Sequence, residues 1–331
     1  MKLFKWHGIA IATAILLVVS CPAPRPQPAG SAPERAVTAG APEFDKAFWM
    51  HWGDGKAEIA AYDLKYPRYG QIRSGVAVTI FVTETFSESA RVKADPGKHP
   101  PADEFPVMKH NLLRDFQTGI YDYNTMLSSF VALKPLNGRP AGAATKLTFS
   151  AQEWCGHAWQ QVLFDAKSAR FTLHSYFDGE ADQQRQIEYP PDGITEDSLF
   201  LWVRGMAWPA LSPAESRNAP ALFSMQTARD THGPLEWNPT MLTRTVIPQT
   251  ITVPAGTFET ELWAAQQEGG ILRRYFVEKA FPHRIIRWEF STGEKAELLG
   301  VDRLEYWKMN GEGAEAALKK LGLAPRPPRT T

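Results

Sequence analysis

Apolar residues in this 331-residue chain fall into short runs that glycine, proline and asparagine separate, and many of the runs alternate with polar residues or are rich in β-branched and aromatic side chains. Runs of this kind are typical of β-strands. The pattern predicts strands over 57–62, 75–83, 124–133, 146–164, 169–177, 180–189, 241–253, 258–266, 271–278, 283–290 and 295–306. The pairs Asn137-Gly138 and Asp178-Gly179 are favoured in tight hairpin turns.

Helical signals are few. An aromatic stretch over 44–52 ends at a Gly-Asp-Gly break, a stretch over 197–204 follows several capping side chains and precedes Gly205, and an Ala/Lys/Leu stretch covers 314–321. Strands at close spacing with so few helices predict an all-β, mainly antiparallel fold. We expect an open half-barrel or barrel-like sheet wrapped around at least one short helix near 197–204.

The domain boundaries follow from composition. Residues 21–43 are rich in Pro, Ala, Gly and Ser, which is typical of a semi-extended tether. No linker-like break separates the β stretches 56–192 and 220–308. We therefore expect a single β-rich domain over 44–310, followed over 311–331 by a short helix and a tail.

The first 20 residues have the pattern of an export signal. Lys2 and Lys5 precede an apolar run over 9–19, which is shorter than the roughly 20 apolar residues that a membrane-spanning helix needs. The run ends in Leu17-Val18-Val19-Ser20-Cys21, which resembles the bacterial lipobox. We expect a lipoprotein signal peptide over 1–20 and lipidation of Cys21. A site for signal peptidase I and an uncleaved anchor are the alternatives.

The lipobox implies the compartment and the partners. Acyl chains on Cys21 would contribute roughly 0.8 kcal/mol per buried CH₂, so the membrane tether would be effectively permanent. Pro22 and Ala23, rather than Asp, follow the cysteine, and by the sorting rule of enterobacterial lipoproteins this implies the periplasmic face of the outer membrane. Cleavage would leave 34 basic and 36 acidic residues, a formal net charge of −2. This balance argues against nucleic acid as a partner.

Two resemblances add to this interpretation. The segment Thr252-Val253-Pro254-Ala255-Gly256-Thr257-Phe258-Glu259-Thr260, with 197–204, 274–277 and 281–285, is similar to an exported bacterial family of unknown function that shares a "VPAGTF-x-T" turn. The resemblance covers about the last third of the chain. It implies an open half-barrel like that of the periplasmic lipoprotein carriers.

The segments 48–61, 91–96, 115–123, 152–156 and 174–184 resemble uncharacterised bacterial lipoproteins, some of which carry the label "septum formation inhibitor Maf". Maf nucleotide pyrophosphatases have a Ser-rich loop with paired arginines on an α/β fold. This sequence has neither feature, so the resemblance does not imply that activity.

One cluster has residue types suited to catalysis. If 146–164 is one strand, Glu153, Cys155 and His157 share a face, because side chains alternate along a strand. A thiol, an imidazole and a carboxylate on one face could supply a nucleophile with its base, or the first ligands of a metal site. The other interpretation is an ordinary strand with a buried Cys155 and a hydrogen-bonded His157. The spacing names no further metal ligands, and we predict neither a metal nor a cofactor.

Several aromatic and polar residues nearby are candidates for lining a ligand site: Trp154, Trp159, His174 and Tyr176. Asp178, Glu180 and Asp182 could bind Ca²⁺ or act in acid–base chemistry, but a solvated Asp-Gly turn is the simpler interpretation. The segment 114–123 mixes aromatic and charged residues and would line a groove or form a packed loop.

The sequence thus favours a non-catalytic protein: a membrane-tethered envelope lipoprotein with a binding or structural role. Its partners would be the membrane, through the N-terminal lipid, and an apolar or glycan-like ligand or an envelope protein. The alternative is an envelope hydrolase that uses Cys155 and His157 with a carboxylate. No P-loop, dinucleotide fingerprint, HExxH pair or CxxC motif occurs in the sequence.

Overall fold

A computed structural model describes residues 40–325, so the expected signal peptide, Cys21 and nearly all of the tether lie outside the described residues. The described chain forms one 16-stranded sheet with the order β8-β7-β6-β5-β4-β3-β2-β1-β16-β15-β14-β13-β11-β10-β9, and β12 pairs with β13. Neighbouring strands are antiparallel except for β9 and β10, which are parallel. The predicted fold class, a mainly antiparallel open sheet with a few short helices, is confirmed.

The strands are β1 (Ala57–Arg68), β2 (Gln71–Ser87), β3 (Glu104–Thr118), β4 (Tyr121–Ala132), β5 (Ala144–Glu153), β6 (Gly156–Phe164), β7 (Ser168–Ser175), β8 (Gln183–Glu188), β9 (Ile194–Thr195), β10 (Ser216–Leu222), β11 (Trp237–Arg244), β12 (Gln249–Val253), β13 (Gly256–Gln267), β14 (Leu272–Glu278), β15 (Ile285–Phe290) and β16 (Lys295–Leu304). The α-helices are α1 (Lys46–Trp52), α2 (Leu199–Trp202) and α3 (Met225–Thr231). The 3-10 helices are η1 (Pro101–Asp103), η2 (Glu196–Ser198), η3 (Tyr306–Lys308) and η4 (Ala314–Leu321).

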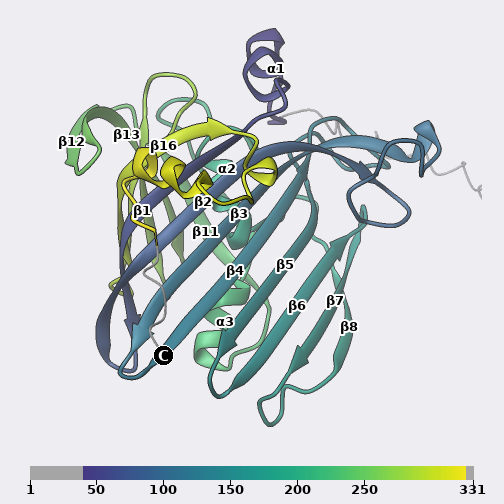
Figure 1. Ribbon diagram of the computed structural model, residues 1–331. Coiled ribbons are helices and arrows are strands. Elements are labelled where there is room, and N and C mark those ends of the chain that lie inside the picture. Colours follow the sequence, from purple (N-terminus) through teal and green to yellow (C-terminus); the bar gives the residue numbers. More distant parts are fainter. Residues whose placement is uncertain (1–39, 326–331) are drawn as a thin grey trace, which may run out of the picture. The chain divides into compact units, whose positions relative to one another are not determined.

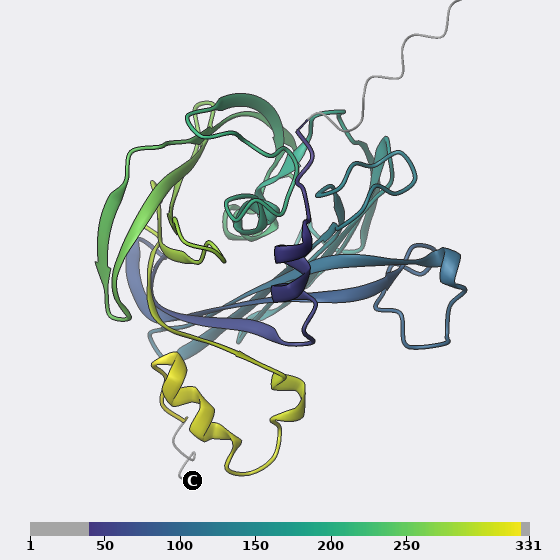
Figure 2. The ribbon, with the colours of Figure 1, turned by 90° about the horizontal axis from the view of Figure 1, so that it is seen from above.

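The first and last long strands, β1 and β16, lie side by side in the middle of the sheet. From β1 the chain runs outward as a meander of hairpins to β8, and beyond β16 lie the strands β15 to β9. The strands encircle the inner helices, so the sheet curls around α2 and α3 (Figures 1 and 2). The strands β8 and β9 form its two free edges, and no ladder joins them.

Side-chain alternation gives the sheet two different faces. On β1, Tyr62 and Leu64 belong to the main core inside the sheet, whereas Ile59 and Ala61 pack on the other face with Leu321 of η4. The strand β1 is therefore buried on both faces over most of its length. Inside the curl, the side chains of Phe200, Leu201 and Trp202 are buried in the same core, so much of the concave face is packed against α2.

Several expected boundaries are wrong. The span 146–164 is not one strand but the hairpin β5–β6, the span 241–253 is divided into β11 and β12, and 114–123 is the tip of the hairpin β3–β4. The strand β10 and the helix α3 were not predicted. Turn-forming residues mark two of these breaks, Gly119 and Pro248, whereas the two-residue tip of the β5–β6 hairpin has no Gly, Pro, Asn or Asp, so propensity gives no signal there.

Within residues 40–325, no helix combines the length and the apolar character that crossing a membrane would need.

Candidate functional site

Three cavities lie around the packed centre of the sheet. One of about 290 Å³ lies beside α1, one of about 220 Å³ lies between α3 and the strands β1 and β15, and one of about 210 Å³ lies between α3 and the strands β6, β7 and β8. In the first two, the principal charged groups already form ion pairs, such as Arg204 with Glu58 and Arg114 with Glu294. The third, which we call the edge pocket, is lined by Arg229, whose ion pair with Glu153 leaves two of its nitrogens without a partner.

The edge pocket combines an apolar wall with polar side chains. Its principal lining residues are Gln160, Phe171, Leu173, Arg185, Arg229 and Leu235. The residues Gln160, Phe171, Leu173 and Arg185 face inward because they alternate with outward-facing residues along β6, β7 and β8. Arg229 and Leu235 come from α3 and from the loop that follows it.

Buried carboxylates fix the start of α3. Asp197 accepts hydrogen bonds from the Ser224 hydroxyl at 2.7 Å and from the Met225 N–H at 3.0 Å. Glu196 accepts one from the Ser224 N–H at 2.9 Å and forms an ion pair with Arg273 at 2.8 Å. Burial raises the pKa of both carboxyl groups above their usual range, although these hydrogen bonds and Arg273 oppose the rise. The segment η2 therefore positions α3 against the sheet.

The side chain of Arg229 enters the edge pocket from α3 with unused donors. Its Nη2 donates to Glu153 Oε1, and its guanidinium carbon lies 3.8 Å from the ring centre of Phe177. Arg229 is 4% exposed, and its Nε and Nη1 atoms have no hydrogen-bond partner. Buried donors of a charged group without partners are costly, so this arginine is arranged to receive an acceptor.

Two further side chains of the edge pocket lack partners. The Arg185 guanidinium lies 4.9 Å from the ring centre of Phe171 and forms no ion pair with any described residue. The Gln160 side chain is 4% exposed and forms no hydrogen bond within the described chain. By contrast, Glu180 accepts from the Ser175 hydroxyl at 2.8 Å and is paired with His232. The buried polar atoms without a partner at the pocket are thus Nε and Nη1 of Arg229 and, next to it, Oε2 of its ion-pair partner Glu153, whereas Arg185 is exposed to solvent. The two arginines offer free N–H donors, which suit a carboxylate or another anion.

The expected arrangement of Glu153, Cys155 and His157 on one strand face is wrong. The strand β5 ends at Glu153 and β6 begins at Gly156, so Trp154 and Cys155 form the two-residue turn between them. Cys155 is an exposed free thiol and His157 is exposed, whereas Glu153 is buried in the ion pair with Arg229. The turn separates the thiol from the inward-facing carboxylate. A catalytic role for Cys155 and His157 stays a prediction.

The predicted ligand-lining residues lie on the outside of the same hairpins. Trp154 and Tyr176 are 69% and 71% exposed, and Trp159 stacks on His174 with ring centres 5.7 Å apart. None of the four lines any of the three cavities described above. Their contact with a ligand stays a prediction. Within residues 40–325, no group of three or more His, Cys, Asp or Glu side chains is arranged to hold a metal ion.

Sequence reasoning missed Arg229, Arg185 and Gln160. Among these three residues, only Arg185 had a sequence signal, because it is a cation on a short polar strand. The signal is weak, since many surface strands carry a cation. Arg229 had no such signal, because the sequence of α3 (Met-Gln-Thr-Ala-Arg-Asp-Thr) has no strong apolar periodicity.

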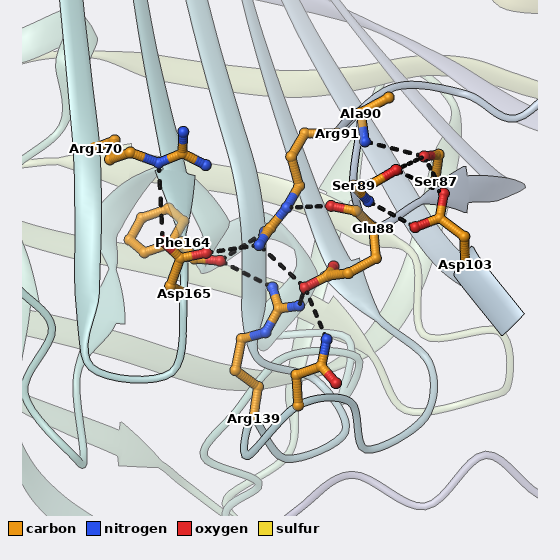
Figure 3. Close-up of polar contacts among 11 residues, drawn as sticks. Ser87, Glu88, Ser89, Ala90, Arg91, Asp103, Arg139, Phe164, Asp165 and Arg170 are labelled. Atoms are coloured by element: carbon orange, nitrogen blue, oxygen red, sulfur yellow. Dashed lines mark hydrogen bonds and ion pairs between the residues drawn. The ribbon is translucent and has the colours of Figure 1, made fainter.

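A second cluster of arginines has a structural role (Figure 3). Arg91 and Arg139 come from different loops and both donate to the carbonyl oxygen of Phe164, at 2.6 Å and 2.9 Å. Both also form ion pairs with Glu88, and Arg91 forms another with Asp165. Each charged member has a partner of opposite charge within the cluster. The cluster therefore ties together the β2–β3, β4–β5 and β6–β7 connections rather than offering a binding site.

Comparison with known proteins yields a distant likeness. No protein-family model and no curated protein matches the chain. The chain is similar in structure to a beta-barrel-like protein from Brucella abortus, a domain of unknown function called DUF1849, with a TM-score of 0.42 and 8% sequence identity. The match covers 76% of this chain and 98% of that one.

Proposed function

We propose that this protein is a membrane-tethered envelope lipoprotein that binds a ligand with a carboxylate, or a similar anion, in the edge pocket. The observation that carries the proposal is Arg229, a buried arginine with two N–H-bearing nitrogens that have no partner beside the pocket. The ligand's anionic group would pair with Arg229 and Arg185. Its apolar part would lie against Phe171, Leu173 and Leu235.

The energetics favour an anion over a neutral group. Hydrogen bonds to charged groups contribute about 1.5–3 kcal/mol, more than those between neutral groups. The planar guanidinium also matches the two oxygens of a carboxylate. A cavity of about 210 Å³ limits the part of the ligand that can be enclosed to a small group.

The cellular setting of the proposal comes from the sequence. The lipobox-like segment at Cys21, the Pro-rich tether and the similarity to uncharacterised bacterial lipoproteins support export and lipid anchoring. They favour a position on the periplasmic face of the outer membrane. A protein tethered there would keep its ligand close to the membrane.

The test compares carboxylates with the corresponding neutral alcohols by isothermal titration calorimetry, on protein that lacks residues 1–21. Medium-chain fatty acids and aromatic acids are the first probes. We expect the acids to bind and the alcohols to bind about tenfold more weakly or not at all, since about 1.4 kcal/mol corresponds to tenfold in affinity. Arg185→Gln should reduce the affinity for the acids by a similar factor.

The matched control is Arg170→Gln. Arg170 lies on β7 with a side chain that is 58% exposed, and it is not among the pocket residues. Its replacement should leave binding unchanged. The proposal would be contradicted if acids and alcohols bound equally well, or if Arg185→Gln and Arg170→Gln lowered the affinity for the acids by the same factor.

A further inference from the structure

The edge pocket lies beside a free edge of the sheet. The strand β8 is hydrogen-bonded to β7 on one side and to no other strand within the described chain. It is the outermost strand in Figure 1, and most of its residues are exposed. A free edge presents unpaired backbone groups to which an extended chain can add.

The phase of the ladder shows which groups are free. The Tyr189 N–H donates to the Lys167 carbonyl at 2.9 Å, and the register continues from there along β7 and β8. Because hydrogen-bonded and non-hydrogen-bonded pairs alternate in an antiparallel ladder, Arg185 directs its backbone groups toward β7. Gln184 and Gln186 direct theirs toward the free edge. The backbone groups of Glu188 point the same way as those of Gln184 and Gln186. In agreement with this, the Glu188 carbonyl accepts a hydrogen bond from Trp237 Nε1 at 2.9 Å rather than from β7.

An added strand would place one side chain at the edge pocket. In an antiparallel pair, residues directly opposite each other share a face, with Cβ atoms about 4.5–5.5 Å apart. The residue opposite Arg185 would therefore project on the same face as Arg185, which lines the pocket. A carboxylate at that position would meet the unpaired Arg185 and face the pocket that Arg229 also lines.

We infer that the natural ligand is an extended peptide segment that adds to β8 as an antiparallel strand and places an Asp or Glu side chain in the edge pocket. This inference rests on the proposed function and names its ligand class. The backbone of Gln184 and Gln186 supplies affinity for any extended chain, and the two arginines select the acidic residue.

Charge favours such a peptide over a second copy of this chain. If β8 paired with a second copy of itself so that Gln184 of one strand lay opposite Gln186 of the other, Arg185 would lie opposite Arg185. Like charges directly opposite each other destabilise a strand pair. An acidic partner avoids this repulsion.

The test measures the affinity of blocked, dye-labelled five-residue peptides by fluorescence anisotropy. The parent peptide is Thr-Val-Glu-Val-Thr, and a second peptide carries Gln in place of Glu. In a third, the two Val residues are N-methylated, which removes the N–H groups that would face Gln184 and Gln186. In a fourth, only the Glu is N-methylated, and this N–H would face away from β8.

We expect the parent and the fourth peptide to bind alike, and the second and third to bind about tenfold more weakly. Arg185→Gln should reduce the preference for Glu over Gln, because only Arg229 would remain to select the acidic residue. Gln184→Pro removes one free N–H without touching the ladder to β7, because Pro is tolerated on the outer side of an edge strand. It should weaken the parent peptide while leaving the binding of a small carboxylate unchanged.

The outcomes separate the two proposals. If small carboxylates bind but both methylated peptides bind as well as the parent, strand addition is overturned and the pocket remains an anion site. If the parent binds through β8 with no preference for Glu over Gln, the acidic class is overturned. If neither carboxylates nor peptides bind, both proposals fail.

Discussion

At the scale of single residues, the inside of the sheet holds a histidine that stays neutral. His110 is fully buried, with its ring centre 4.6 Å from that of Phe81 and 5.0 Å from that of Phe200. Burial, together with the positive charges of Arg204 and Arg114, lowers its pKa to about 3. A doubly protonated ring would leave the Nε2–H without a partner, since only Nδ1 has one, the Ser129 hydroxyl at 3.4 Å.

This histidine predicts that acid destabilises the protein. Between the unfolded pKa of 6.5 and the folded value of about 3, the unfolded chain binds a proton that the folded chain does not. Stability therefore falls as the pH falls through this window, by up to about 1.4 kcal/mol per pH unit from this residue. His110→Phe should remove that contribution. Urea denaturation of both proteins from neutral pH down to about 4 measures it, and parallel losses in the two proteins would contradict the prediction.

At the scale of elements, the longest hairpins depend on close approach of their backbones. A Cβ atom at Gly75 of β2 would lie 2.3 Å from the Asp115 carbonyl oxygen and 2.7 Å from the Phe116 Cβ on β3. The Phe116 ring cannot yield easily, because it stacks on Tyr66 and Tyr123 with ring centres 4.8 Å and 5.1 Å away. Only glycine fits this point of the β2–β3 ladder.

Gly75→Ala should therefore destabilise the fold by about 1–3 kcal/mol, the usual cost of forcing atoms into a packed site. The control is Gly311→Ala, because nothing lies within 4 Å of a Cβ at Gly311. Thermal unfolding followed by circular dichroism compares the two variants. A Gly75→Ala protein as stable as the control would show that the strands can separate locally at no cost.

At the scale of the whole molecule, one sheet supports the pocket, the arginine cluster and the inner helices. The helix α1, close to the start of the described chain, lies at one end of the sheet, and α3 lies toward the other (Figure 1). The edge pocket involves α3 and the β7–β8 turn, through Gly179. Local changes at the pocket therefore leave the N-terminal connection unaltered, and tethering can be tested separately from binding.

The tethering prediction concerns Cys21. We expect Cys21→Ala to move the protein from the membrane fraction to the soluble fraction of a Gram-negative host, because the acyl chains supply the anchor. A second variant, with residues 1–21 replaced by a leader that signal peptidase I cleaves, should also be soluble. Mass spectrometry of the wild-type N-terminal peptide should show the acyl groups. Equal membrane retention of all three proteins would overturn the prediction.

Local patterns were sufficient for most of the fold. The runs 75–83 and 271–278 lie within or overlap strands of the structure, and Gly205 follows the inner helix with φ 73°. These features depend on side-chain alternation and on turn residues, which act over a few neighbours. The turn at Trp154 and Cys155 was missed for the same reason, since neither residue favours a turn. Because of that turn, Glu153, Cys155 and His157 do not lie on one strand as expected.

By itself, the sequence determined a strand-rich antiparallel sheet, because side-chain alternation and turn residues are encoded in consecutive residues, whereas export and lipidation at Cys21 stay predictions. Only the tertiary structure decided the site. Arg185 on β8, Arg229 on α3 and Gln160 on β6 meet because the sheet curls, and because the carboxylates of Glu196 and Asp197 fix α3 against it. Such convergence depends on packing between distant segments, which no local pattern records.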